Sequence, residues 1–260
     1  MSIDLDTYCD VILRAGRDDE GLFGKTSSYY GTVESQGRLT LHLHLLLWIE
    51  GAYSPQDIRD RVMDADSGFR DAIIRWLEGC HQGEFNFGSL DEVGSRVRER
   101  GMHAEPMTDV TTELPHVPPE NLTEEVAMDW YKGMCADVDE IVYLSNRHSQ
   151  DHRHGCKKSR FSPCKARFPR TVVWDTTVEP DTGAIRMKKR EEWINTFSNV
   201  LSYVLRCNSD VTCLLSGTQV RAIVAYVTDY ITKMSLKTHA VFEVARNLRC
   251  ARYPFVGGCV

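Results

Sequence analysis

The strongest constraint on the fold is an alternating run at residues 39–49, which reads Leu-Thr-Leu-His-Leu-His-Leu-Leu-Leu-Trp-Ile. Successive side chains of a β-strand point to opposite faces, so Leu41, Leu43 and Leu45 face a core together. Turn residues at 36–38, Gln-Gly-Arg, separate this run from a shorter strand at residues 32–35. The pattern therefore predicts an antiparallel β-hairpin.

Two histidines lie on the other face of the expected strand. Because His42 and His44 are two residues apart, their imidazoles project together and can hold one divalent ion. Glu34 and Gln36 share a face of the preceding strand, and either one could complete a mixed nitrogen and oxygen site suited to Mg²⁺ or Mn²⁺. The alternative is a strand with two partly exposed histidines and ordinary cross-strand polar pairs.

The charge of the chain is divided unevenly between its two halves. Residues 1–145 carry 12 Lys+Arg against 28 Asp+Glu, whereas residues 146–260 carry 19 against 9. A basic half suits a phosphate-binding surface, and mutual neutralisation of the halves across an interface explains the asymmetry equally well. No apolar run is long enough for a membrane span and no signal peptide is recognisable, so the 9 cysteines are expected to be reduced thiols or metal ligands.

A segment rich in histidine and cysteine opens the basic half. Its ligand number and type suit tetrahedral zinc, and Cys135 could also take part. The candidate ligands are His148, His152, His154, Cys156 and Cys164. The alternative is a basic surface loop in which the cysteines are incidental.

Cations and aromatic residues are interleaved from residue 146 to residue 190. Phe161, Phe168 and Trp174 stand among twelve lysines and arginines. Cations can bind phosphates while rings stack on bases, so the mixture suits single-stranded nucleic acid, although a solvated loop has the same composition.

A late helix, expected from Thr218 to about residue 233, carries two tyrosines and a lysine. Tyr226, Tyr230 and Lys233 follow the spacing i, i+4 and i+7, which places them on one face. Core packing is the ordinary explanation of such a pair. The functional alternative is a pair of phenolic nucleophiles, which need a nearby metal or lysine because the pKa of a phenol is about 10.

A phosphate-binding P-loop is excluded. Residues 21–26 resemble the end of a P-loop, but Asp19 stands where the pattern requires glycine, so no ATPase motor motif is present.

The whole sequence divides into four consecutive segments. Residues 1–81 contain a first helix, a turn-rich stretch, the hairpin and two helices, one capped by Ser54-Pro55 and one with apolar residues at 69, 73, 74 and 77. Residues 82–120 form an acidic, proline-containing loop or linker. Residues 121–170 hold a helix, from 121 to 144, and the Cys/His segment. Residues 171–260 hold β-like pieces near 172–174 and 185–187, a helix or strand at 196–206, and the tyrosine helix.

Several of these blocks together resemble a known family. Residues 30–48 resemble the two-histidine block of the Rep proteins of Helitron transposons, which are HUH endonucleases of the rolling-circle type, and residues 226–233 resemble their paired-tyrosine block. Residues 155–169 resemble the Cys-rich insert of fungal members, and residues 206–212 are also similar. The blocks keep the family's order, and this region is often called the Helitron helicase-like domain.

The resemblance implies a fold and a mechanism. The fold is α+β, with an antiparallel HUH-type sheet carrying the histidines, packed helices and a Cys/His-rich insert with structural zinc. His42 and His44, with Gln36 or Glu34, would hold Mg²⁺ or Mn²⁺. Tyr226 or Tyr230 would attack single-stranded DNA to leave a 5′-phosphotyrosine, with Lys233 near the phosphate. An upstream block and the helicase domain of full-length relatives are not in this sequence, so a fragment is expected, working in the nucleus.

Two other functions are consistent with the same residues. An inactive, zinc-stabilised remnant of such a transposon protein would bind nucleic acid without forming a covalent adduct. A protein-interaction domain, in which the histidine and tyrosine pairs only pack, would show neither DNA affinity nor metal dependence.

Overall fold

The computed structural model describes residues 7–35, 41–64, 68–103, 110–121, 123–152, 155–157, 159 and 161–234. Within these ranges the chain forms seven helices and two antiparallel sheets of two strands each, which confirms the expected α+β class. The chain divides into two compact units, each built from separated segments: a larger unit of residues 1–12 and 53–215, and a hairpin unit of residues 13–52 and 216–260.

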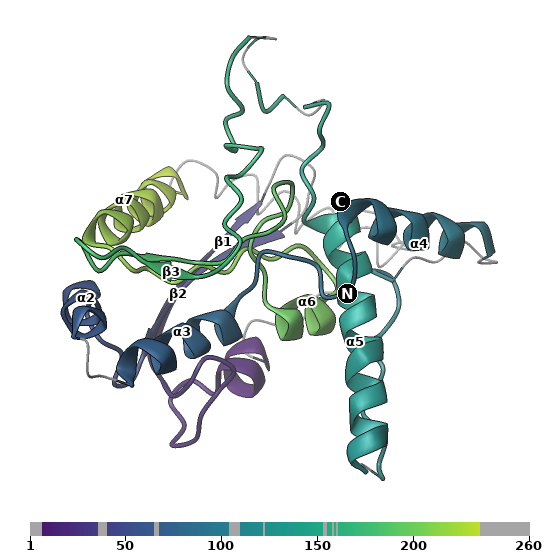
Figure 1. Ribbon diagram of the computed structural model, residues 1–260, viewed down its shortest axis with the longest axis horizontal. Coiled ribbons are helices and arrows are strands. Elements are labelled where there is room, and N and C mark those ends of the chain that lie inside the picture. Colours follow the sequence, from purple (N-terminus) through teal and green to yellow (C-terminus); the bar gives the residue numbers. More distant parts are fainter. Residues whose placement is uncertain are drawn as a thin grey trace, which may run out of the picture. The chain divides into compact units, whose positions relative to one another are not determined.

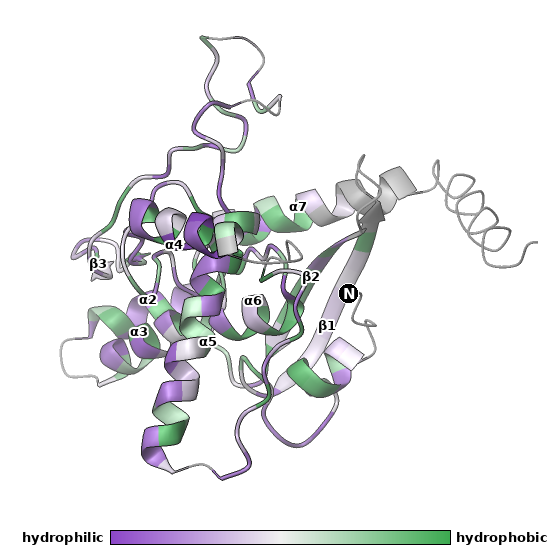
Figure 2. Ribbon diagram, turned by 90° about the vertical axis from the view of Figure 1, so that its right-hand side faces the viewer, coloured by the Kyte–Doolittle hydropathy of each residue, from purple (hydrophilic) through white to green (hydrophobic). Residues whose placement is uncertain are grey.

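The hairpin unit contains the expected β-hairpin. Strands β1 (Thr26–Ser35) and β2 (Leu41–Ile49) pair antiparallel, and their register places Thr32 opposite His44 and Glu34 opposite His42. Strand β1 begins six residues earlier than expected, because Thr26 to Tyr30, expected in a turn-rich stretch, take part in the pairing. Helix α7 (Gly217–Met234) contacts β1 within this unit (Figure 2).

The larger unit is organised around one long helix, α5 (Glu124–Ser145), which confirms the helix expected there. Thr123 caps it by accepting a hydrogen bond from the Val126 N–H, and two glutamates stand in its first turn, where the helix dipole favours negative charge. Helices α4 (Leu90–His103) and α6 (Asn199–Leu205) pack against α5 (Figure 1). The core they enclose consists of Phe85, Val93, Met134, Cys135, Val138, Val142, Ile194, Phe197 and Tyr203.

Two further helices of this unit match the expected pattern. Helix α2 (Pro55–Met63) begins at a capping box in which Ser54 and Asp57 exchange hydrogen bonds, and it packs against α3 (Phe69–Cys80). Near the start of the chain, the expected helix is a short π-helix, η1 (Tyr8–Leu13). No helix in the described part of the chain is long and apolar enough to cross a membrane.

The prediction of a loop or linker at residues 82–120 is wrong over residues 90–103, where helix α4 forms. The signal for this helix is a capping box: the Ser89 N–H donates to the Glu92 carboxylate at 2.7 Å, and the Glu92 N–H donates back to Ser89 Oγ. Gly94 weakens the helix propensity but allows close packing, since a Cβ there would lie 2.8 Å from the hydroxyl of Tyr143 on α5.

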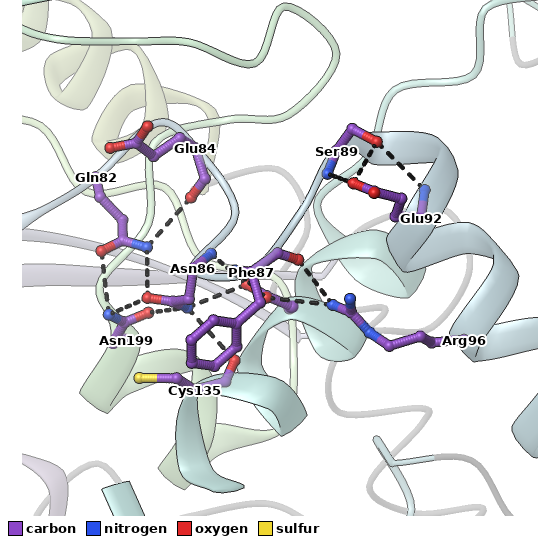
Figure 3. A network of polar contacts seen from close by, with 10 residues as sticks. Gln82, Glu84, Asn86, Phe87, Ser89, Glu92, Arg96, Cys135 and Asn199 are labelled. Atoms are coloured by element: carbon purple, nitrogen blue, oxygen red, sulfur yellow. Dashed lines mark hydrogen bonds and ion pairs between the residues drawn. The ribbon is translucent and has the colours of Figure 1, made fainter. Parts of the chain in front are cut away.

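A buried carboxylate orders the chain just before α4. Asp139 of α5 is fully buried and accepts hydrogen bonds from the backbone N–H groups of Asn86 and Phe87, at 2.7 and 2.8 Å, with Arg96 at 3.4 Å (Figure 3). Asn86 in turn exchanges hydrogen bonds of 3.1 Å with Asn199 of α6. Residues 84–89 are therefore held against α5 and α6 rather than forming a linker.

Of the two β-like pieces expected in the basic half, the one at 185–187 is confirmed and the one at 172–174 is offset. The paired strands are β3 (Thr177–Val178) and β4 (Ile185–Arg186), joined through the expected turn at 180–183. Val173 is linked to Lys189 by a single bridge rather than by a strand. The segment that we expected to be helix or strand at 196–206 is helix α6.

Candidate functional site

The first candidate site lies in the hairpin unit and brings together residues from the two ends of the chain. The rings of His42 and His44 are 4.7 Å apart on β2, in an edge-on arrangement. The ring of Tyr226, from α7, lies 5.3 Å from the ring of His44 and is also edge-on. Tyr226 is 43% exposed, so this residue is accessible from solvent.

For three other residues expected at this site, the structure describes the backbone position alone. Glu34 stands opposite His42 in the register of the hairpin, and Tyr230 and Lys233 belong to α7 one and two turns beyond Tyr226. The side chains of these three residues, and all of Gln36, lie outside the described residues. The hairpin and the helix therefore juxtapose two imidazoles and one phenol, with a carboxylate-bearing position across the ladder.

The second candidate site lies in the larger unit and is a cluster of two histidines and two cysteines. The ligand atoms of His148, His152, Cys156 and Cys164 all lie within 4.8 Å of one another. His148 Nε2 is 3.3 Å from His152 Nδ1 and 3.5 Å from Cys164 Sγ, and His152 Nδ1 is 3.2 Å from Cys156 Sγ. This His₂Cys₂ cluster could bind a metal such as zinc.

The loop around the cluster is held in shape by its backbone. The Lys165 N–H donates to the Cys156 carbonyl at 2.7 Å, and the His148 N–H donates to the Trp193 carbonyl at 2.8 Å. Gly155, with φ of +70°, adopts the left-handed conformation that glycine accepts without strain. The two cysteines therefore approach each other because the chain reverses direction between them.

The backbone around Cys164 favours its thiolate form. Burial raises the pKa of this thiol, but hydrogen bonds from the N–H groups of Phe168 and Ala166, with one from Cys156, outweigh burial and lower the pKa. Burial and the neighbouring Cys164 raise the pKa of the Cys156 thiol. A thiolate is the form of cysteine that binds a metal.

An aromatic ring fixes the orientation of one ligand. Phe168 is buried and stacks on the imidazole of His148 at 4.5 Å with an interplanar angle of 5°. The guanidinium of Arg170 covers the same ring at 4.7 Å from its centroid. Groups that orient a ligand tune a metal site although they do not touch the ion.

Of the other two residues considered for the zinc site, the structure describes only Cys135. Cys135 belongs to the buried core on α5, because it lies on the same helical face as Val138 and Val142. His154 lies outside the described residues.

The sequence analysis missed a third group of reactive side chains. Cys80, at the end of α3, donates a hydrogen bond to Cys213, which lowers the pKa of Cys213, and the His81 ring nitrogen lies 3.8 Å from Cys213 Sγ. No local spacing connects residues 80 and 213, so only the tertiary structure could reveal this group.

Comparison with known proteins does not assign the chain to a family. No family model matches the sequence, and neither the curated proteins nor the solved structures include a match.

Proposed function

We propose that the hairpin unit is the catalytic part of a metal-dependent nickase and strand transferase of the Helitron Rep type, acting on single-stranded DNA. The observation that carries the proposal is the short distance between the His42–His44 pair and Tyr226. Core packing alone does not explain this group well, since Tyr226 is 43% exposed and both histidines are only partly buried. A metal-binding pair beside an accessible phenol is what tyrosine-dependent DNA cleavage requires.

The separation of the two imidazoles is compatible with a shared divalent ion. A metal–nitrogen bond of about 2.1 Å places each ring centroid about 3.2 Å from the ion, so ligands at about 90–100° have centroids about 4.5–5 Å apart. The observed separation of 4.7 Å falls in this range. Glu34, opposite His42, is the residue in register to add an oxygen ligand, and a mixed nitrogen and oxygen set suits Mn²⁺ or Mg²⁺.

The reaction that follows is a transesterification. The oxygen of Tyr226 attacks the phosphorus of a DNA phosphodiester, and the bond from phosphorus to the preceding 3′-oxygen breaks. The phenolic proton ends on that oxygen, so the products are a 5′-phosphotyrosine and a free 3′-hydroxyl. A bound divalent ion would supply charge neutralisation at the scissile phosphate. His42 and His44 would hold that ion, and the edge-on contact with His44 positions the phenol.

The second tyrosine would allow strand transfer. Tyr230 follows Tyr226 by one helical turn, so both belong to the same face of α7. A second phenol there could cleave another strand before the first is released. Lys233, at i+7, would add a positive charge for the phosphate.

We also propose that the His₂Cys₂ cluster holds structural zinc. Bonds of about 2.05 Å to nitrogen and 2.3 Å to sulfur give tetrahedral edges of about 3.3 Å between nitrogens and about 3.6 Å between nitrogen and sulfur. The separations of 3.3, 3.2 and 3.5 Å among the side chains are close to these edges. A full set of four protein ligands is typical of a structural site rather than a catalytic one.

The complete cluster also supports a second candidate function. An inactive, zinc-stabilised remnant would retain this ligand set, and its nucleic-acid binding, without needing the histidines of β2. The two functions differ in one product, a covalent protein–DNA bond.

A gel assay separates these functions. The purified chain is mixed with a labelled pool of single-stranded oligonucleotides and Mn²⁺, and SDS-resistant protein–DNA bands are compared for wild type, Tyr226→Phe and His42→Ala. A band that needs Mn²⁺ and both side chains supports the nickase. Salt-sensitive DNA binding without a band, from a chain that is folded by circular dichroism, supports the remnant. If the folded chain shows no DNA binding and no band, both functions are overturned.

A further inference from the structure

The cations of the basic half fall into two groups with different surroundings. Near β3 and β4 they are neutralised: Arg186 pairs with Glu179, while Lys188 and Arg190 both pair with Glu84. Lys189 is partly buried and donates to the Ile194 carbonyl. Arg170 and Arg147 lie over the rings of Phe168 and Tyr143 and keep their charge. The surface near β3 and β4 therefore offers little positive charge to a phosphate.

The loop of the His₂Cys₂ cluster differs from that surface. Lys157, Lys165 and Arg167 flank the two cysteines, and no carboxylate of the described residues lies within ion-pair distance of them. Lys165 and Arg167 are exposed, and Lys157 is partly exposed. The loop therefore keeps its positive charge available to a partner.

An aromatic ring stands at the tip of the same loop. Phe161 lies between Cys156 and Cys164 and is 94% exposed, more than any other large hydrophobic side chain in the described part of the chain. A turn carries it outward, in which the Ser162 N–H donates to the Ser159 carbonyl and the two hydroxyls lie 2.7 Å apart. An exposed ring in a loop that also carries cations is suited to stack on a base.

We infer that this loop is a contact site for single-stranded DNA, in which Phe161 stacks on a base while Lys157, Lys165 and Arg167 bind phosphates. The inference rests on the proposed function for the identity of the nucleic acid. It adds a binding site separate from the residues that would cut the strand. The metal cluster would serve to hold the ring and the cations in one arrangement, so that little conformational freedom is lost on binding.

Fluorescence anisotropy with a labelled mixed-sequence 20-mer tests the site, in the zinc-loaded Tyr226→Phe protein and without Mn²⁺, so that no cleavage occurs. Phe161→Ala is expected to weaken binding about 10-fold. Trp174→Ala is the matched control, since Trp174 is 70% exposed but lies beside the ion-paired Arg190, and it should leave affinity within about 2-fold. Equal losses in both variants, or no loss in Phe161→Ala, would overturn the inference.

Salt dependence tests the cations separately. Replacing Lys157, Lys165 and Arg167 by alanine should reduce the slope of log affinity against log salt by about 2, because each phosphate contact to a single strand contributes about 0.7. An unchanged slope contradicts phosphate binding by this loop. Phe161→Trp should retain affinity and its emission should be quenched by single-stranded DNA, whereas no quenching at saturation contradicts stacking.

The outcomes distinguish this inference from the proposed function. An Mn²⁺-dependent adduct with unchanged binding in Phe161→Ala leaves the nickase standing and removes the loop site. Binding that depends on Phe161, without any adduct from the wild-type chain, supports the loop site and contradicts the nickase.

Discussion

The two candidate metal sites differ in how far apart their residues stand in the sequence. The His₂Cys₂ cluster gathers four ligands from one short loop, with His148 and Cys164 only 16 positions apart. The other site combines His42 and His44 of β2, two positions apart, with Tyr226 of α7, near the opposite end of the chain. The cluster can therefore form from local geometry and bound metal, whereas the His/Tyr site exists only when the hairpin unit is folded.

This difference predicts which site couples to stability and which to chemistry. A loop without a large core of its own depends on its metal, because metal binding contributes directly to folding. Histidines on a paired strand are held by the backbone ladder whether or not an ion is bound. Removal of metal should therefore unfold the loop of the His₂Cys₂ cluster and leave the His/Tyr site folded but inactive.

The largest effect is expected for His42→Ala. Loss of one ligand should slow adduct formation by about 10³-fold, equivalent to about 4 kcal/mol, because charge neutralisation by the ion is lost. Zinc content should stay at one equivalent, and the melting temperature should change little. His116→Ala is the control, since this exposed histidine contributes only its carbonyl, to Tyr203, among the contacts described. An unchanged rate in His42→Ala would show that this histidine is no ligand for catalysis.

The second effect is expected for Cys164→Ser. Serine cannot supply the thiolate, so bound zinc should disappear and the free energy of unfolding should fall by about 3 kcal/mol. This loss corresponds to a decrease of roughly 6–12 °C in melting temperature. Cys207→Ser serves as control because Cys207 is exposed and lies outside the cluster. If zinc content and melting temperature are the same in both variants, the cluster is not a structural metal site.

A smaller effect is expected for Phe168→Leu. The ring stacked on His148 is lost, so the ligand is less well oriented and zinc affinity should fall about 10-fold. Competition with a chromophoric chelator measures this affinity, and the rate of adduct formation provides the comparison with the His/Tyr site. A lower rate at full zinc occupancy would mean that the two sites are not independent.

The smallest effect is a pH dependence of the larger unit. Burial lowers the pKa of Lys189 to about 8, with Arg170 adding to the shift. Between about pH 8 and the ordinary lysine pKa of about 10.5, the unfolded chain binds more protons than the folded one, so stability contributed at Lys189 rises with pH. The free energy of unfolding of wild type relative to Lys189→Met should therefore increase from pH 7.5 to pH 10. A flat or falling difference would contradict the burial of a charged Lys189.

Local patterns predicted the elements that depend on neighbours in the sequence. The hairpin, α2, α3, α5 and the four cluster ligands all follow from alternation, capping residues or ligand spacing. Helix α4 was missed because Gly94 and many charges obscure its periodicity, although the Ser89–Glu92 capping box marks its start. Its stability comes from tertiary contacts that no local pattern encodes, above all the close approach of Gly94 to Tyr143.

In the candidate sites too, local spacing predicts some features and the tertiary structure decides the others. Spacing placed His42 and His44 on one face and Tyr226 on a helix, but spacing could not place the phenol beside His44. That proximity depends on the packing of α7 against β1. The ring of Phe168 behind His148, and the approach of Cys80 to Cys213, depend on the fold in the same way.

Mapping the DNA-modified residue tests the central claim most directly. The wild-type chain is incubated with single-stranded oligonucleotide and Mn²⁺, the adduct is digested with nuclease and protease, and the nucleotide-bearing peptide is sequenced by mass spectrometry. The account predicts a phosphotyrosyl bond at Tyr226 that is absent in His42→Ala. Modification confined to a tyrosine outside α7, or at Tyr226 independently of His42 and Mn²⁺, would contradict it.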